Sequence, residues 1–563
     1  MAYNILGIHP GHNGAAALVS DGKLVYYLEE ERLSRSKRDG NPFRVIIDIC
    51  SKYKVDELII GGTGDKFEFS KLPYDEESPY FALVRKFYPN IKLTWANLNH
   101  HLLHGLCAYF NSSFPKAGIL IIDGSGSTIN SENSDKIGFE CETIFSAQNN
   151  KFDTKYKNIG TNSITREVDK NFNIDNGTFI TKTYEAVTKY LGWDAIEGGK
   201  TMGLAPYGKP NPLIPPLYLN GMGNRNLFYP VYASHAILDE KNNNIFQRKH
   251  DPKEWHTDPT KLTEIEADIA WKVQNESQIS VADLVEKTIE LSNSNNICIA
   301  GGYGLNCVTN YFIKKQFPKI NFFHEPISHD GGTAIGAAYY GWINYSGNAP
   351  NFNSSTIYLG PKYSTNQYLT TLKNYNNKFN PHKTTPKQVA KLISERNIVT
   401  IFQGRSEAGP RALGNRSILY DPTDPNGKDF VNKVKKREWF RPFAGTVLLE
   451  KANEYFDMAG LKESPFMMYA MDVWPDKQEK IKAITHVDGT CRIQTVTEEQ
   501  NPHYYKLIQE FEKITGVPIL FNTSFNLAGD PLVETIEDAL ETILKSELKY
   551  LYLPELEMLL EKK

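Results

Sequence analysis

Short apolar runs separated by polar turns dominate the start of the chain. Tyr3–Ile8, Ala15–Val19 and Leu24–Leu28 are apolar, and the polar segments HPGHNG and SDGK separate them. Apolar runs of this length, bounded by Gly, Pro, Asn and Asp, are typical of strands joined by tight turns. The sequence therefore predicts a strand–turn–strand–turn–strand unit at the amino terminus.

A strand that ends in a glycine turn recurs further along the chain. Ala117–Asp123 leads into a Gly-Ser turn, and Ile297–Asn306 (ICIAGGYGLN) again ends in a glycine loop. The segment HDGGTAIGAAYYG follows, and we expect it to be a turn that opens a helix of small residues. Backbone N–H groups at such turns bind anions. This repetition suggests the duplicated ribonuclease-H-like core of actin-like ATP-binding proteins.

The best domain boundary lies in Asn344–Thr365, which is polar, rich in Pro and Gly and without amphipathic periodicity. We expect two domains, residues 1–350 and 360–563, in a chain of the α/β class. In the second domain the pattern predicts a helix over Pro386–Arg396, a strand over Ile398–Gln403 and a strand that begins with Ile519–Phe521.

Composition narrows the class of protein. The chain has 563 residues, a formal net charge of −3 and six scattered cysteines without a CxxC pair. A pI near 6.5 gives no sign of bulk polyanion binding. No apolar run approaches the roughly 18 residues of a membrane span, and the first residues lack the basic start of a secretion signal. We therefore expect a cytoplasmic protein with reduced thiols and no membrane association.

Arginine and lysine gather in two neighbouring segments. GRSEAGPRALGNRSILYDP carries Arg405, Arg411 and Arg416, and KKREWFRPFAG follows it. The cations of the second segment are Lys435, Lys436, Arg437 and Arg441. A solvated surface is the alternative, but interleaved glycine, proline and aromatic residues favour a shaped anion-binding site, because guanidinium groups suit phosphate and carboxylate oxygens.

Histidines and aspartates suggest a metal site. His100 and His104 are four residues apart and so share one face of a predicted helix, whereas His101 faces elsewhere. Asp123 and Asp330, each in an Asp-Gly turn, add two oxygen ligands. Such a set suits iron, manganese or zinc better than calcium. The alternative is that the histidines cap or pack and the aspartates serve their turns.

Other polar positions are candidates for catalysis or binding. His12 follows the first strand and could act as a general base near neutrality, although His9 competes for this role. In EEERLSRSKRDGNPF, Lys37 is a candidate phosphate contact, and a salt-bridged surface is the alternative reading of Arg32, Arg35 and their neighbours.

Two late segments carry alternating polar residues. Asn522, Ser524 and Asn526 alternate with Thr523 and Phe525, so we expect them to share one strand face, as Arg492 and Gln494 do on another strand. Buried polar faces need partners. They could pair with each other, but beside the arginine segments a nucleotide is the better interpretation.

Together these segments resemble the NodU/CmcH carbamoyltransferase family. The motifs that carry the resemblance run through nearly the whole chain: GHNGAAAL, EEERLSRSK, NHHLLHG, EGGKTMGLAPYG, GGYGLN, DGGTAIGAA, GPRALGNRSIL, FRPFAG, HVDGTCRIQT and GVPILFNTSFN. The resemblance implies an amino-terminal actin-like ATPase-fold (ASKHA) domain followed by a YrdC-like domain. It also implies an ATP-dependent O-carbamoyltransferase that converts carbamoyl phosphate to carbamoyl-adenylate and passes the carbamoyl group to an acceptor hydroxyl.

The resemblance also implies roles for individual residues. The adenylate and its precursors would be bound by Arg411, Lys435, Arg441, Arg492, Asn522 and Ser524. A divalent metal, Fe²⁺ before Mn²⁺ or Zn²⁺, would be held by His100, His104, Asp123 and Asp330. His12 and Lys37 would serve the transfer step, and ATP with Mg²⁺ and carbamoyl phosphate would be the small-molecule partners.

The sequence leaves several alternatives open. Family members often have His-Asp where this chain has His12-Asn13, and neutral Asn13 cannot support a histidinium as an aspartate would. The acceptor could be a small molecule with a hydroxyl or a nucleoside or nucleic-acid hydroxymethyl group. A non-catalytic ATP-binding regulator is the alternative from another class of protein, and a homo-oligomer is left open.

Overall fold

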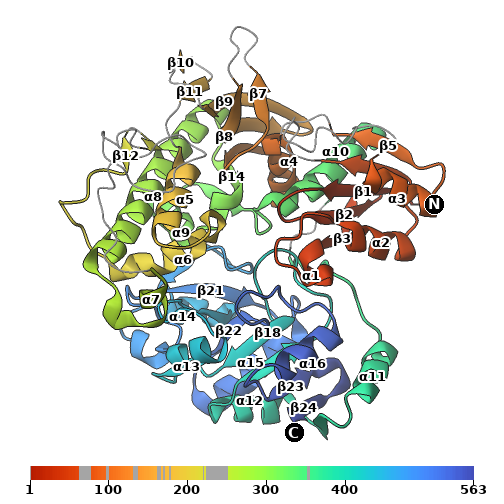
Figure 1. Cartoon of the computed structure of the whole chain (residues 1–563), viewed down its shortest axis with the longest axis vertical. Helices are drawn as coiled ribbons and strands as arrows, with labels where there is room; N and C mark the ends of the chain where they lie inside the picture. The colour runs from red at the N-terminus through yellow and green to blue at the C-terminus, as the bar shows by residue number, and fades with distance from the viewer. Residues whose placement is uncertain are drawn as a thin grey trace. The chain divides into compact units, whose positions relative to one another are not determined.

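The computed structural model forms two compact units (Figure 1). The first comprises Met1–Glu30 and Arg38–Asn353, and the second comprises Glu31–Lys37 and Ser354–Lys563. The structure describes residues 2–61, 78–96, 100–130, 137–161, 167–168, 172–175, 179–219, 221–223, 252–351 and 355–563. Glu31–Lys37 lies outside the second domain as the sequence predicts it, because a short segment of the amino-terminal part packs with the carboxy-terminal residues.

The first unit begins with a five-stranded sheet of order β3-β2-β1-β4-β5. Its strands are β1 (Asn4–His9), β2 (Ala15–Ser20), β3 (Lys23–Glu29), β4 (Glu57–Ile60) and β5 (Lys92–Trp95). β2 runs antiparallel to β1 and β3, whereas β1, β4 and β5 are parallel. The three strands predicted at the amino terminus are confirmed.

The same topology recurs in the second sheet of this unit. The order β9-β8-β6-β14-β15 is built from β6 (Lys116–Ile122), β8 (Ile137–Gln148), β9 (Lys151–Thr161), β14 (Asn296–Ala300) and β15 (Asn321–His324). β8 is antiparallel to β6 and β9, and β6, β14 and β15 are parallel. Strand order and direction therefore repeat, which confirms the duplicated ribonuclease-H-like fold. β10 (Glu167–Val168) and β11 (Phe172–Asp175) extend this sheet beyond β9, and β7 (Thr128–Asn130) pairs with β8.

Two buried helices bring the ends of these sheets together. α4 (His100–Ser112) and α10 (Thr333–Ser346) consist largely of buried residues. A Cβ atom at Gly7 of β1 would overlap the backbone of Ala334, and one at Gly336 would overlap the backbone of Leu103. Glycine at these two positions thus lets α10 approach both β1 and α4 closely. This contact fixes where the first residues of α4 and α10 lie.

The remaining helices of the first unit flank the sheets. They are α2 (Phe43–Lys52), α3 (Pro79–Phe87), α5 (Ile180–Tyr190), α6 (Gly198–Leu204), α7 (Pro252–Thr257), α8 (Glu264–Ser292) and α9 (Cys307–Gln316), and a two-stranded sheet joins β12 (Tyr218–Leu219) to β13 (Met222–Gly223). α1 (Glu30–Ser34) begins at the last residue before the first unit is interrupted.

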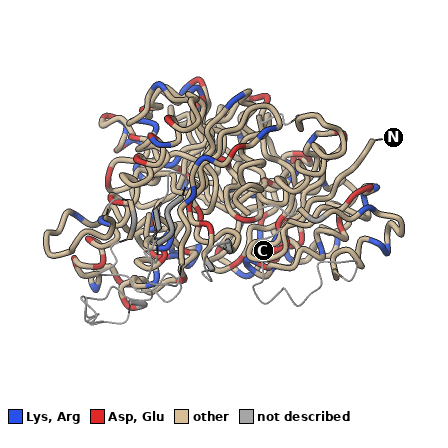
Figure 2. Tube along the Cα trace, turned by 90° about the horizontal axis from the view of Figure 1, so that it is seen from above, with Lys and Arg blue, Asp and Glu red and all other residues tan. Residues whose placement is uncertain are grey.

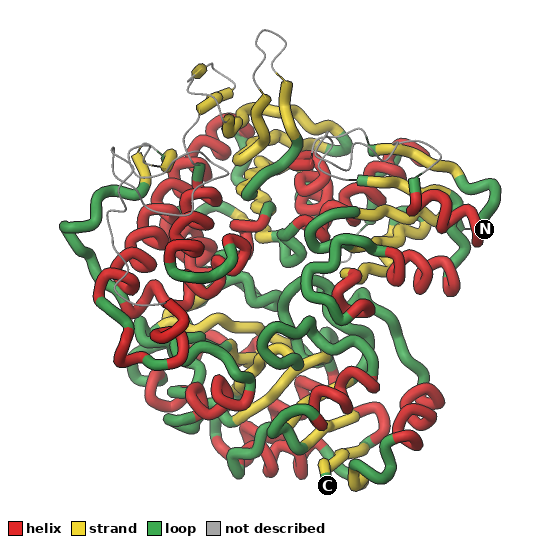
Figure 3. Tube along the Cα trace, in the orientation of Figure 1, coloured by secondary structure: helices red, strands yellow, loops and turns green. Residues whose placement is uncertain are grey.

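The second unit is built on a mixed nine-stranded sheet of order β16-β24-β23-β17-β18-β22-β19-β21-β20. These strands are β16 (Phe379–Lys383), β17 (Val399–Phe402), β18 (Arg416–Tyr420), β19 (Ala444–Leu448), β20 (Ala470–Asp472), β21 (Thr490–Val496), β22 (Ile519–Ser524), β23 (Tyr550–Leu553) and β24 (Met558–Lys562). Helices and strands are both abundant in the structure (Figure 3), as expected for the α/β class.

The α-helices described in the second unit are α11 (Thr365–Asn374), α12 (Pro386–Ser394), α13 (Gly427–Val434), α14 (Ala452–Tyr455), α15 (Pro502–Thr515) and α16 (Ile536–Leu544). Side-chain caps begin α11, α12, α15 and α16. In α12, Thr385 and Gln388 form a capping box and Pro386 occupies the first turn. The predicted helix at Pro386 and the predicted strands at Ile398 and Ile519 are confirmed.

The distribution of charged, apolar and cysteine residues agrees with the composition. Lys and Arg are interspersed with Asp and Glu along the trace (Figure 2). Among the described residues, no helix is long and apolar enough to cross a membrane. All six cysteines are buried free thiols.

Candidate metal centre and anion-binding site

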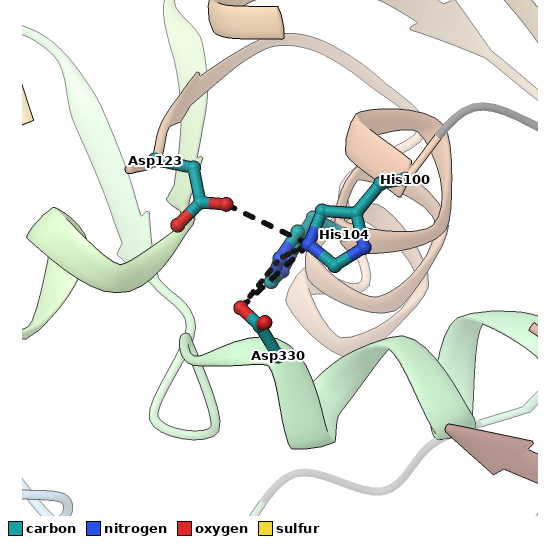
Figure 4. A group of neighbouring side chains, drawn as sticks. All are labelled: His100, His104, Asp123 and Asp330. Carbon is teal, nitrogen blue, oxygen red and sulfur yellow. Dashed lines mark hydrogen bonds and ion pairs between the residues drawn. The ribbon is translucent and has the colours of Figure 1, made fainter. Parts of the chain in front are cut away.

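Four side chains converge at the start of α4 and α10 (Figure 4). His100 and His104 come from α4, Asp123 follows β6, and Asp330 lies three residues before α10. One ligand atom of each lies within 4.8 Å of the others. The two Nε2 atoms are 3.1 Å apart, and His100 Nε2 is 3.6 Å from Asp123 Oδ2. Ligand atoms around one tetrahedral ion at about 2.1 Å stand roughly 3.4 Å apart, so this set fits a divalent metal with nitrogen and oxygen ligands.

The charges of this cluster also favour a bound cation. Burial opposes protonation of His100, but Asp123 and Asp330 outweigh it and raise the pKa of His100 to about 10. Burial and neighbouring His100 lower the pKa of His104 to about 3. Burial and Asp123 act to raise the pKa of Asp330, but the nearby histidines hold it below its usual value. Without a metal, His100 therefore carries a proton between the two carboxylates. A divalent cation would displace this proton and balance the two negative charges of Asp123 and Asp330 beside two neutral imidazoles.

Hydrogen bonds from neighbouring elements hold the two aspartates. Asp123 Oδ1 accepts the backbone N–H of Gly302 at 3.0 Å. The turn of Asp330 is fixed by His329, whose Nδ1 accepts the N–H of Gly331 at 3.1 Å. His329 Nε2 therefore carries the ring proton of the neutral imidazole, and it lies 3.2 Å from Glu29 Oε1 at the end of β3. Glu29 thus orients the turn that presents Asp330.

The His12 turn lies next to this cluster. The N–H of Gly11 donates to Gly40 O at 2.8 Å, and the N–H of Gly14 donates to Asp39 O at 2.9 Å, so the DGNP segment supports the turn. Asn13 has φ of 60°, a left-handed conformation that asparagine tolerates better than most residues. The side chain of His12 is exposed. Burial of part of the ring lowers its pKa, against the opposing effect of Asp330.

His9 differs from His12 in its surroundings. Its side chain is buried, Nδ1 is 2.8 Å from Thr333 Oγ1, and Nε2 is 3.2 Å from the backbone oxygen of His12. Burial lowers the pKa of His9 to about 4. Both ring nitrogens are engaged in the protein interior, so His9 supports the turn and α10.

A cation cluster forms in the second unit around Lys435. This side chain is 2% exposed, and its ammonium group donates to Ser524 O, to Ser524 Oγ at 3.3 Å and to Asn526 Oδ1 at 3.2 Å. Burial, Arg437, Arg441 and Lys37 together hold the pKa of Lys435 well below its usual value. A buried ammonium with neutral partners and cationic neighbours is costly unless an anion joins it.

Strand pairing brings Arg492 and Asn522 to the same face of the sheet. Both lie opposite Ala444 of β19, Arg492 on β21 and Asn522 on β22. Between the two polar side chains, Ala444 contributes only a methyl group to this face. Asn522 Nδ2 also donates to Thr446 Oγ1 at 2.9 Å and to Ala412 O at 3.3 Å, next to Arg411. The loop of Arg411 is therefore tied to the strand face of Asn522.

The structure places Asn526 and Arg416 differently from the sequence-based prediction. Asn526 lies beyond the end of β22, so it does not extend the strand face of Asn522 and Ser524. Arg416 is fully buried, and the anion it meets is Glu534 at 3.7 Å, with the ring of Phe402 3.7 Å from its guanidinium carbon. That position stabilises the core.

Two further predicted positions, Arg405 and Lys37, contact backbone oxygens. Arg405 donates to the backbone oxygens of Leu359 and Gly360. Lys37 belongs to the second unit, with Nζ 3.4 Å from Asp530 O.

Comparison with known families decides the class of protein. Residues 81–339 match the family model described as carbamoyltransferase N-terminus, and residues 390–561 match the one described as carbamoyltransferase C-terminus. The chain belongs to the carbamoyltransferase family. It is therefore a transferase enzyme.

Relatives of this carbamoyltransferase span most of its length. Nodulation protein NolNO of Sinorhizobium fredii is 30% identical and covers 95% of this chain and 77% of its own. An uncharacterised protein of Synechocystis is 31% identical over 98% of this chain and 95% of its own. Among solved structures, full-length HypF is similar over 61% of this chain and 56% of its own, with 10% identity and a TM-score of 0.31, too weak a likeness to carry an inference.

The structure of this carbamoyltransferase adds residues that the sequence pattern does not single out. Glu29 and His329 hold the Asp330 turn. Arg437, which the sequence already groups with Lys435 and Arg441, stands within the cation cluster, and burial, Arg441 and Arg492 lower its pKa. The position of Glu29 at the end of a predicted apolar strand is a sequence signal that could have identified it. His329 could not be found in this way, because its contact joins residues 300 positions apart.

Proposed function

We propose that this carbamoyltransferase forms carbamoyl-adenylate in its second unit and transfers the carbamoyl group to an acceptor hydroxyl in its first. Water cleaves carbamoyl phosphate to carbamate and phosphate. A carbamate oxygen then attacks the α-phosphorus of ATP, and pyrophosphate leaves. In the transfer step the acceptor oxygen attacks the carbamoyl carbon, its proton passes to a base, and AMP leaves. The acceptor is a hydroxyl-bearing molecule, with a nucleoside or nucleic-acid hydroxymethyl group as the alternative.

One observation carries this proposal: the buried ammonium of Lys435 beside Arg437 and Arg441. Adenylation brings a negatively charged carbamate to a negatively charged nucleotide. Cations that are already in position offset this repulsion and stabilise the charge that develops on leaving pyrophosphate. Arg411, Arg492, Asn522 and Ser524 complete the proposed set. ATP would enter with Mg²⁺.

The transfer step is proposed for the cluster of His100, His104, Asp123 and Asp330. These four side chains would hold the metal, for which Fe²⁺ is our first choice and Mn²⁺ or Zn²⁺ the alternatives. When bound, the metal supplies Lewis-acid polarisation of an oxygen of the adenylate or the carbamoyl group. His12 is exposed beside this cluster and would accept the proton of the acceptor hydroxyl, an effect worth about 10²–10⁴-fold in rate.

Lys37 is proposed as a contact of the anionic intermediate, since its charge acts on Lys435. Six buried thiols fit a reducing compartment, so we propose a cytoplasmic location.

The test offers ATP and carbamoyl phosphate without an acceptor. We expect release of pyrophosphate and formation of carbamoyl-adenylate. Arg441→Ala should lower adenylate formation by about 10²-fold or more, because it removes a cation that faces the developing charge. Lys433→Ala is the matched control, since Lys433 is exposed on α13. Unchanged adenylate formation in Arg441→Ala would refute the assignment of this site.

A further inference from the structure

A seven-residue segment of the amino-terminal part is built into the second unit. Glu31–Lys37, here called the strap, follows the end of β3 and precedes α2 along the chain, yet it packs with the carboxy-terminal residues. Its cationic side chains make contacts within the second unit. Neither the proposed chemistry nor the metal cluster accounts for Arg32 and Arg35 of this strap.

Arg35 forms hydrogen bonds with the loop that follows β22. Nη1 donates to Leu532 O at 2.7 Å and Nη2 donates to Pro531 O at 2.9 Å, and Nε lies 3.6 Å from Asp538 Oδ1. Two parallel N–H donors on neighbouring carbonyl oxygens fix both the position and the angle of that loop.

From this loop, hydrogen bonds lead directly to the cation cluster. Asp530 O, the carbonyl oxygen before Pro531, accepts from Asn526 Nδ2 at 2.6 Å. Asn526 Oδ1 accepts from Ser524 Oγ at 2.6 Å and from Lys435 Nζ at 3.2 Å. The backbone N–H of Ala528 also donates to Lys435 O at 3.1 Å. The loop held by Arg35 therefore orients the amide that positions Lys435.

Arg32 forms a hydrogen bond with a second loop, the one that carries Arg411. Its side chain is 2% exposed, and Nη2 donates to Gly409 O at 2.7 Å. Gly409 has φ of 80° and stands two residues before Arg411. Burying a guanidinium group costs free energy unless hydrogen-bond acceptors compensate for the lost water. By binding the carbonyl oxygen that precedes Pro410, Arg32 limits where the Arg411 side chain can lie.

We propose that Arg32 and Arg35 are positioning residues for adenylate formation. The strap holds both loops that carry the anion-binding groups: Arg32 the loop of Arg411, and Arg35 the loop behind Lys435 and Ser524. The second unit is then complete as an adenylate-forming site only with these residues in place. The inference rests on the proposed function of the second unit.

The experiment uses the full-length protein with Arg35→Lys and Arg35→Ala. Lysine keeps the charge but cannot bind two carbonyl oxygens at once. A displaced cation cluster should lower kcat/KM for adenylate formation by about 10–100-fold in Arg35→Ala. The kcat/KM of Arg35→Lys should be closer to that of Arg35→Ala than to that of the wild type. Arg396→Ala is the matched control, because Arg396 is an exposed arginine of the second unit whose guanidinium group lies 3.7 Å from Asp424, away from the strap.

Amide hydrogen exchange provides a readout that does not depend on the reaction. We expect faster exchange in residues 526–533 for Arg35→Ala and in residues 407–414 for Arg32→Lys, with the rest of the sheet unchanged. If the wild type makes no carbamoyl-adenylate, the proposed function fails, and hydrogen exchange still tests the strap. Unchanged exchange together with unchanged kcat/KM in Arg35→Ala would overturn the inference. A uniform rise in exchange across the unit would also overturn it, because it would indicate a purely structural role.

Discussion

At the scale of single residues, backbone conformation suits the asparagine that follows His12. Asn13 adopts φ of 60°. Asparagine and aspartate both tolerate this conformation, and asparagine adds no charge to the turn. Burial lowers the pKa of His12, Asp330 acts to raise it, and Arg38 acts in the opposite direction to Asp330.

Glu29 is expected to increase the metal affinity of the cluster, because it positions His329 and thereby the Asp330 turn. Glu29→Ala removes the carboxylate that lies 3.2 Å from His329 Nε2 and should release the Asp330 turn, so the affinity for Mn²⁺ should fall by about 10–100-fold. Glu29→Gln keeps an acceptor oxygen and should restore most of the affinity. Calorimetric titration with Mn²⁺ measures both. Glu286→Ala, an exposed glutamate on α8, is the control, and equal affinity in Glu29→Ala and the wild type would remove the role of Glu29.

His324 on β15 is expected to contribute to acid sensitivity. Burial lowers its pKa to about 3 from an ordinary value near 6.5. Between these values the unfolded chain binds a proton that the folded chain does not, so stability falls as pH drops below about 6.5. At pH 5 this single group costs about 2 kcal/mol.

The test compares unfolding by urea at pH 7 and pH 5. His324→Phe should lose less stability than the wild type over this interval, by roughly that 2 kcal/mol. An identical loss in the two proteins would show that His324 is not neutral in the folded state.

At the scale of elements, β3 ends in side chains that organise its neighbours. Glu29 supports the Asp330 turn, and Glu30 caps α2 from outside the helix. Pro42, at the N-cap position of α2, offers no side-chain hydrogen bond. Instead the Glu30 oxygens accept the N–H groups of Arg44 at 3.2 Å and Val45 at 3.0 Å. Two of the three glutamates in this run, Glu29 and Glu30, thus have separate structural roles.

Loss of this cap should weaken the first unit. Glu30→Ala leaves two N–H groups at the start of α2 without their acceptor, and we expect a loss of about 1–2 kcal/mol. Glu30→Gln should recover part of it, because an amide oxygen also accepts. The free energy of unfolding of the first unit measures the change. A loss below about 0.5 kcal/mol in Glu30→Ala would contradict the capping role.

At the scale of the whole molecule, two sites with different ligands predict separable half-reactions. A chelator should remove the metal from the cluster of His100, His104, Asp123 and Asp330 and abolish transfer to the acceptor. Adenylate formation, measured as pyrophosphate release with Mg²⁺ restored, should persist. His104→Ala should behave like the chelated enzyme, because it removes one of the four proposed ligands.

Arg441→Ala should show the reverse pattern, with metal content unchanged and no adenylate formed. Metal analysis and pyrophosphate release, measured on the same preparations, separate the two cases. Full metal occupancy in His104→Ala would remove the metal assignment.

The sequence by itself determined the elements whose signals are local. The strands at Tyr3, Ala15 and Leu24, the helix at Pro386 and the four-residue spacing of His100 and His104 depend on periodicity and turn residues. Repeated strand-glycine units indicated the duplicated fold, and a series of motifs indicated the family. These features can be read from the sequence because each depends on neighbours within a few residues.

Only the tertiary structure decided which distant groups meet. It assigned Arg416 to Glu534, His329 to Glu29 and the strap to the second unit, over separations of about 100 to 500 residues. It also separated His9 from His12 by burial, although they are three residues apart. Burial and long-range pairing depend on how the elements pack, and no local pattern encodes the partner that a buried charge will find.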